Sequence, residues 1–197
     1  MKYQWDPQLS DREVQFIGTI FVQWGALEHE IFIQTLLTFS PHEDETNVPI
    51  LPKEMNNLQF SGELELWKKR VAKVWRGRRG KLLQQQYNEI QELKELRDAL
   101  AHGMWHWSRE DLGEIRTVRV KKREMITSRF SADFLADVAN KVGEINFKVR
   151  FSGGPIDVAM QRMEDGVYMS RRAVAMFSGA PLDAEGYLTA HPHKGNT

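Results

Sequence analysis

Apolar residues recur at helical spacing along the first part of the chain. They follow Ser10-Asp11-Arg12-Glu13, which has the residue pattern of a capping box, with Ser10 as the N-cap and Glu13 reaching back to it. The apolar positions are Val14, Ile17, Ile20, Phe21, Trp24, Leu27 and Ile31, with Leu36 and Leu37 beyond them. This spacing predicts a long amphipathic helix, which the proline at residue 41 ends.

Two further helices are predicted after a polar loop. The second begins at the N-cap residue Ser61, with Glu63 in its first turn, where the helix dipole favours an acid. Its apolar stripe is Leu64, Trp67, Val71, Val74 and Trp75, and residues 76–80 break it. The third is predicted over residues 81–102, with an inner face of Leu83, Tyr87, Ile90, Leu93, Leu96 and Leu100. Gly103 occupies the position where a left-handed glycine closes a helix.

A strand-like pattern replaces the helical pattern directly after residue 103. Residues 104–108, 113–121 and 124–130 are rich in aromatic or β-branched side chains, and charged turns separate them. We therefore predict a small antiparallel sheet or hairpin at this point of the chain.

Helical spacing returns after Ser131, which is a further N-cap candidate. The apolar positions of this last long helix are Phe134, Leu135, Val138, Val142, Ile145 and Val149, and the glycines and proline of residues 152–155 stop it. A short helix at 155–163 and another segment at 167–177 are predicted next. The small, polar, aperiodic residues 180–197 are predicted to form a loose tail.

This order of elements predicts a mainly α fold. The class is an antiparallel helical bundle with a small antiparallel β-hairpin or sheet inserted after the third long helix. We expect the bundle to occupy residues 1–155, including the β insertion at about residues 104–130. Residues 156–197 are expected to be a weakly structured C-terminal extension.

The amino-acid composition is that of an ordinary globular protein. Of the 197 residues, 41% are apolar and 27% are charged, and acidic and basic residues are equal in number at 27 each, so the net charge does not indicate a partner. The absence of cysteine excludes disulfides and thiolate metal sites. The sequence has no apolar run of membrane-spanning length, no signal-peptide core, no P-loop and no nucleophile elbow. We expect a cytoplasmic protein without membrane attachment, and assign no cofactor or metal.

Residues 93–103 combine side chains that are suited to phosphate chemistry. Asp98 and His102 are four residues apart, so they lie on one face of a helix. Arg97 and His102 are five residues apart, which separates them by about 140° around a helix of 3.6 residues per turn. We expect these two to converge only if the chain unwinds near His102, which Gly103 would permit, and a second subunit would ease the same problem.

These groups have the chemistry to cleave RNA without a metal ion. His102 lies at the negative end of the helix dipole with a carboxylate one turn earlier, which favours the imidazolium form and suits proton transfer. The Arg97 guanidinium suits a phosphate oxyanion. The ribose 2′-hydroxyl would attack the neighbouring phosphorus while Arg97 stabilises the developing charge. The same residue types also occur in plain helical scaffolds, where Arg97 and His102 would serve only as an ion-paired helix end.

The segment Arg97-Asp98-Ala99-Leu100-Ala101-His102 resembles the R-x4-6-H signature of HEPN domains (higher eukaryotes and prokaryotes nucleotide-binding). In that signature a polar residue, often Asn, follows the arginine, and here it is Asp98. The string Leu-Arg-Asp-x-x-Ala-His-Gly is similar to that of bacterial members, and the helical setting is similar over residues 10–150. The resemblance implies a homodimer whose two motifs face one cleft. In many members it also implies a metal-independent endoribonuclease in a toxin or phage-defence setting, with Arg97 and His102 catalytic and Asp98 assisting.

Other residues are candidates to support this site. Glu28 lies on the apolar face of the first helix, where an acid needs a partner. It is expected either to pair with Arg97 and orient it, or to be solvated at the edge of the stripe. Gly103 supplies the helix end, and Trp105 is a candidate wall of the cleft or of the dimer seam.

Residues 68–81 contain many basic residues and no acidic one. Such a run indicates either a surface that binds a polyanion or simply a solvated face. Trp75 lies within this run but belongs to the predicted core stripe, so stacking on a base is the weaker interpretation of it. The predicted RNA contacts are Lys69, Arg70, Lys73, Arg76, Arg78 and Arg79. A second basic patch is predicted on the hairpin, at Arg116, Arg119, Lys121, Lys122 and Arg123.

The sequence therefore predicts a metal-independent endoribonuclease of HEPN type that acts on RNA as a homodimer, with an antitoxin or other protein as a candidate further partner. The alternative is a non-catalytic HEPN-like module that binds a nucleotide, RNA or a protein in the same cleft. A third interpretation is a plain helical scaffold.

Overall fold

The computed structural model describes residues 9–39 and 51–165 of the chain. The chain divides into two compact units, residues 1–150 and 151–197. The first unit contains α1 (Asp11–Leu37), η1 (Lys53–Met55), α2 (Phe60–Trp67), η2 (Lys68–Ala72), α3 (Gly77–His102), β1 (Met104–Ser108), β2 (Asp111–Lys121), β3 (Glu124–Phe130) and α4 (Ala132–Arg150). The second unit contains α5 (Pro155–Glu164), which is the short helix predicted there. The predictions for 167–177 and 180–197 lie outside the described residues.

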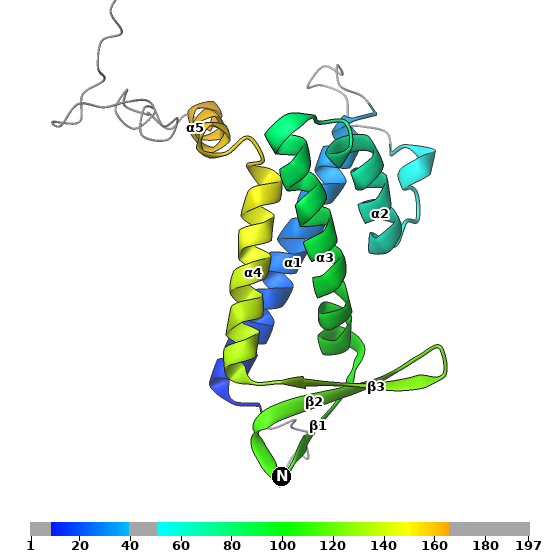
Figure 1. The fold of residues 1–197 in the computed structure, drawn as a ribbon, viewed down its shortest axis with the longest axis vertical. Coiled ribbons are helices and arrows are strands. Elements are labelled where there is room, and N and C mark those ends of the chain that lie inside the picture. Colours follow the sequence, from blue (N-terminus) through cyan, green and yellow to red (C-terminus); the bar gives the residue numbers. More distant parts are fainter. Residues whose placement is uncertain (1–8, 40–50, 166–197) are drawn as a thin grey trace, which may run out of the picture. The chain divides into compact units, whose positions relative to one another are not determined.

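Long helices that run side by side form the body of the first unit. α1 packs most extensively along α4, and α3 also packs against α4 (Figure 1). The strands form one antiparallel sheet in the order β1-β2-β3, inserted between α3 and α4 (Figure 1). The prediction of a mainly helical chain with a small antiparallel sheet after the third long helix is confirmed. Within the described ranges, no helix is both long and apolar enough to cross a membrane.

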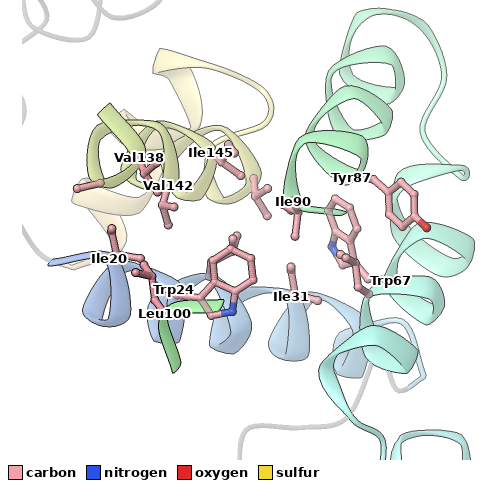
Figure 2. Packing of buried hydrophobic residues seen from close by; sticks show 14 of the residues in the cluster. Ile20, Trp24, Ile31, Trp67, Tyr87, Ile90, Leu100, Val138, Val142 and Ile145 are labelled. Carbon is pink, nitrogen blue, oxygen red and sulfur yellow. The ribbon is translucent and has the colours of Figure 1, made fainter. Parts of the chain in front are cut away.

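Most residues of the predicted apolar stripes meet in one core, but Val14, Leu37 and Phe134 are more than 40% exposed. Figure 2 shows Ile20, Trp24 and Ile31 of α1, Trp67 of α2, Ile90 and Leu100 of α3, and Val138, Val142 and Ile145 of α4 in this cluster. Each of these side chains is at most 5% exposed. Burying one large apolar side chain stabilises the fold by about 1.5–3 kcal/mol. The cluster therefore fixes α3 against its neighbours as far as its last turns.

The region between α2 and α3 differs from its prediction. α2 begins after Gln59 rather than after Ser61, and no side chain caps it. It continues into η2, a π-helical turn that ends at Ala72, and residues 73–76 are not helical. Val74 and Trp75 lie in this non-helical stretch and are 66% and 46% exposed, so their assignment to the core stripe was wrong. α3 then begins at Gly77, earlier than the predicted residue 81.

Gly103 is not in the predicted left-handed conformation. Its φ is −74° and its ψ is 148°, which is extended backbone, because β1 begins at the next residue. A Cβ atom at Gly103 would lie 2.4 Å from the carbonyl oxygen of Ala99 and 2.5 Å from Cβ of Thr117. Glycine is therefore required here by the close approach of β2 to the end of α3.

The register of the sheet fixes which side chains face the helices. Met104 pairs with Val118 and Trp105 with Thr117, so each pair shares a face. Thr117 is 1% exposed, and Trp105 packs against the core on the same side. The β2–β3 turn places Lys122 and Arg123 at positive φ, 50° and 72°, as a two-residue hairpin turn requires.

Candidate functional site

The last turns of α3 bring the predicted motif to one cavity. Arg97, Asp98 and His102 all line a cavity of about 560 Å³, together with Glu28, Leu58, Gln59, Phe60, Ser61, Glu63 and Lys94. We call this the motif cavity. α3 remains helical through His102, so the expected unwinding does not occur. His102 is exposed, and Arg97 is half-buried one turn before it.

The Arg97 guanidinium is held between two carboxylates. Its Nη2 lies 3.5 Å from Oε1 of Glu28, and its Nη1 donates to Oδ1 of Asp98 at 3.2 Å. The same Glu28 oxygen accepts a hydrogen bond of 2.8 Å from the indole Nε1 of Trp24. Of the two arrangements expected for Glu28, the structure forms the ion pair. The buried indole thus orients the carboxylate, and the carboxylate orients the guanidinium.

Lys94 is a residue of the site that the sequence interpretation missed. Its Nζ lies 3.2 Å from Oδ2 of Asp98, one helical turn away. Asp98 therefore has two cationic neighbours, Lys94 and Arg97, which offset its negative charge beside the motif cavity. The i, i+4 spacing of Lys94 and Asp98 was the available signal.

Glu63 is a second missed residue, since its position in the first turn of a helix was explained by the helix dipole alone. Its Oε1 is buried and has no hydrogen-bond partner among the described residues. Burial, and next the negative charge of Glu28, raise the pKa of this carboxyl above its usual range. Glu63 therefore holds its proton more tightly than a solvated glutamate does.

A second cavity lies on the other side of His102. It has a volume of about 460 Å³ and is lined by Lys94, Glu95, Asp98, His102, Met104, Val118, Arg119, Val120 and Lys121. We call it the sheet cavity. It shares Lys94, Asp98 and His102 with the motif cavity, so these side chains form a wall between the two.

Glu95 of α3 lines the sheet cavity and pairs with two basic residues of β2. It accepts a hydrogen bond of 2.6 Å from Nζ of Lys121 and another from Arg119. The hydrogen bond from Lys121, more than the one from Arg119, lowers the pKa of the Glu95 carboxyl. Two of the basic residues predicted on the hairpin are thus partly neutralised by the helix.

The structure separates the six predicted RNA contacts into different roles. Lys69 and Lys73 line a third cavity of about 330 Å³, the lysine cavity, with Glu54, Leu58, Gly62, Glu65, Leu66 and Lys68. Arg70 instead closes the end of α1, since its guanidinium donates to the hydroxyl and carbonyl oxygens of Thr38 at 2.7 and 2.9 Å. Arg79 stacks on Trp75 at 3.8 Å from the ring centroid. Arg76 and Arg78 are exposed and line none of these cavities.

Trp105 and Gly103 do not line the cavities either. Trp105 is half-buried against the core, on the face of β1 that the helices cover, so its predicted place as a wall of the cleft is not supported by its position. Gly103 affects the site only indirectly. Its close contact with Thr117 fixes the position at which α3 ends, directly after His102. Within the described residues no group of three or more histidine, aspartate and glutamate side chains is arranged to hold a metal ion.

Comparison of the chain with protein-family models, with curated proteins and with solved structures finds no match.

Proposed function

We propose that this chain is HEPN-like and acts as a metal-independent endoribonuclease in a homodimer. The observation that carries the proposal is that Arg97, Asp98 and His102 line one cavity, with the imidazole exposed. The Arg97 guanidinium is anchored there by Glu28 at 3.5 Å. A phosphodiester that enters the motif cavity would meet a proton-transfer group and an oriented positive charge.

In the proposed reaction the ribose 2′-oxygen attacks the adjacent phosphorus, and the bond from phosphorus to the next 5′-oxygen breaks. The products are a 2′,3′-cyclic phosphate and a 5′-hydroxyl, so the step consumes neither water nor a redox partner. One imidazole accepts the proton of the 2′-hydroxyl, and a protonated imidazole gives a proton to the leaving 5′-oxygen. Arg97 stabilises the negative charge that develops on the non-bridging oxygens.

The two proton transfers are the reason to propose a homodimer. No histidine besides His102 lines the motif cavity in the described part of one protomer. α3 is helical through His102, so Arg97 and His102 lie about 140° apart around it although both line the motif cavity. A two-fold axis beside the motif would bring the His102 of each protomer to one phosphodiester, the first as base and the second as acid.

Binding without cleavage is the second candidate, and the charge pairing in the cavity favours it. Arg97 already contacts Glu28 and Asp98, and Asp98 contacts Lys94. A phosphate would have to compete with these carboxylates for the guanidinium. A HEPN-like module of this kind would hold a nucleotide or RNA in the motif cavity without accelerating its hydrolysis.

An assay of RNA cleavage in the presence of EDTA distinguishes the two candidates. We expect the wild-type chain to cleave RNA, His102→Ala to reduce the rate by about 10²–10⁴-fold, and Arg97→Ala by about 10²–10³-fold. His106→Ala is the matched control, because His106 is an exposed histidine on β1 that lines none of the cavities.

Cleavage that survives both motif substitutions would overturn the proposal. RNA binding that is lost in Arg97→Ala, with no cleavage by the wild-type chain, would establish the second candidate instead. Neither binding nor cleavage would leave the motif as an ion-paired helix end.

A further inference from the structure

The three cavities adjoin one another through shared lining residues. The sheet cavity and the motif cavity share the wall of Lys94, Asp98 and His102. The motif cavity and the lysine cavity share Leu58, which precedes α2 and is 39% exposed. The order is therefore sheet cavity, motif cavity, lysine cavity, with His102 at the first boundary and Leu58 at the second.

Each cavity is large enough to hold part of a ligand, since small-molecule sites typically occupy about 300–1,000 Å³. A single compact ligand would fill one of them. A ligand in contact with all of them has to be extended and has to cross the walls at His102 and Leu58.

The three cavities differ in how far their basic side chains are paired with carboxylates. In the sheet cavity, Arg119 and Lys121 pair with Glu95. In the motif cavity, Lys94 and Arg97 pair with Asp98. The lysine cavity contains two carboxylates, Glu54 and Glu65, and Glu65 accepts a hydrogen bond from the hydroxyl of Tyr87. Within the described ranges, neither carboxylate forms an ion pair with Lys69 or Lys73. The exposed lysines that are not held in an ion pair therefore lie at the lysine end.

The backbone of the lysine cavity is itself unusual. Lys69 belongs to the π-helical turn η2, and Lys73 is the residue that closes this turn. π-helical turns occur mostly as single insertions in helices, often at functional sites. Lys68 of the same turn stacks on the Tyr87 ring at 3.8 Å, which fixes the start of the turn and leaves Lys69 and Lys73 exposed.

We propose that the three cavities form one track for single-stranded RNA, with the scissile phosphate at the His102 wall and backbone phosphates of the distal segment bound by Lys69 and Lys73. This inference rests on the proposed function, because it takes RNA as the substrate. It adds an extended binding site to that function. The lysine cavity, beyond Leu58, would strengthen RNA binding without taking part in the cleavage reaction.

The test uses 2′-O-methyl RNA, which lacks the attacking hydroxyl and cannot be cleaved, with the full wild-type chain. A dinucleotide reaches only the cavities beside His102, whereas an oligomer of about eight nucleotides is within the length that single-strand sites hold. We expect Lys69→Gln with Lys73→Gln to weaken octamer binding about tenfold, as for two exposed ion pairs, and to reduce the salt-dependence slope by about 1.4. Dinucleotide binding should not change.

The matched control is Lys53→Gln with Lys81→Gln, which removes the same charge from two exposed lysines that line none of the cavities and are not among the predicted RNA contacts. It should change octamer affinity less than twofold. Equal weakening by the two double variants, or equal weakening of dinucleotide and octamer, would overturn the track while leaving the proposed function standing. Absence of octamer binding by the wild-type chain, together with absence of RNA cleavage, would reject the proposed function and the track with it.

Discussion

At the scale of single residues, Arg97 is oriented by a chain of contacts that begins in the core. Trp24 is 2% exposed and donates to Glu28, and Glu28 faces Arg97 at 3.5 Å. The exposed fraction of the Arg97 side chain is 27%, so the ion pair contributes little to stability. In the proposed reaction its effect is on position, because displacing the Arg97 guanidinium would reduce the rate without unfolding the protein.

Glu28→Gln is the variant that separates these effects. The amide oxygen still accepts the bond from Trp24, but the charge that faces Arg97 is gone. We expect kcat for RNA cleavage to fall about ten- to hundredfold, while the free energy of unfolding changes by less than about 1 kcal/mol. Parallel kinetic and denaturation measurements check this. A loss of stability that accounts for the whole loss of rate would show that Glu28 is only structural.

Glu63 predicts a pH dependence of stability. Its pKa is raised in the folded chain, so the folded state binds more protons than the unfolded state just above the unfolded pKa. Stability contributed by Glu63 is therefore full at acidic pH and is lost as the pH rises through the folded pKa. Glu63→Gln, which is neutral throughout, should stabilise the chain at pH 7 and lose that advantage at low pH. Denaturation at both pH values tests this, and a variant less stable at pH 7 would contradict it.

At the scale of the elements, the sequence patterns predicted most boundaries because each has a local cause. The capping box at Ser10 and Glu13 starts α1, and the Ser131 hydroxyl accepts from the backbone of Phe134 at the start of α4. β1 and β3 have their predicted ends. The end of η2 at Ala72 has no comparable sequence signal, and it leaves Val74 and Trp75 outside the core.

The sequence predicted those parts of the site that depend on the residue spacing within a single helix. The motif spacing on α3 indicated Asp98 and His102 on one face, and the apolar setting of Glu28 indicated a partner. Glu63 and the division of the basic run were not predictable, because they depend on which elements meet in space. Gly103 was identified correctly as the helix end but for the wrong reason, since Thr117, distant in sequence, sets its requirement.

Gly103 therefore carries an element-scale prediction. Gly103→Ala should destabilise the chain by about 1–3 kcal/mol, because the added Cβ overlaps Ala99 and Thr117. Gly18→Ala in α1 is the control, since a Cβ at Gly18 meets nothing within 4 Å. It should stabilise the chain by about 0.5–1 kcal/mol, as alanine does in a helix. Thermal unfolding of both variants measures this, and a neutral Gly103→Ala would contradict the close packing.

Glu95 carries the second prediction at this scale, because it joins α3 to β2. Its pKa is lowered in the folded chain, so its contribution to stability is present above the unfolded pKa and is lost as the pH falls through the folded pKa. Glu95 is 49% exposed, so Glu95→Gln should cost less than about 1 kcal/mol at pH 7 and nothing at strongly acidic pH. Glu92→Gln, an exposed acid on the same helix, is the control. A cost that persists in acid would show that the pairing is not its source.

At the scale of the whole molecule, the proposed chemistry requires two chains. The mass in solution should be twice the 22.9 kDa of one chain. If each chain supplies one of two imidazoles, excess His102→Ala mixed with wild-type chain should suppress the activity per wild-type chain as mixed dimers form. Excess His106→Ala should not. Activity that is independent of added His102→Ala would mean that one protomer suffices.

The chemical ends of the RNA fragments made in EDTA test the central claim most directly. Attack by the 2′-hydroxyl, with His102 and Arg97 at the phosphate, predicts fragments that carry a 2′,3′-cyclic phosphate and a 5′-hydroxyl. These ends should disappear with His102→Ala and persist with His106→Ala. Fragments that carry a 5′-phosphate and a 3′-hydroxyl, or ends unchanged by loss of His102, would contradict the account.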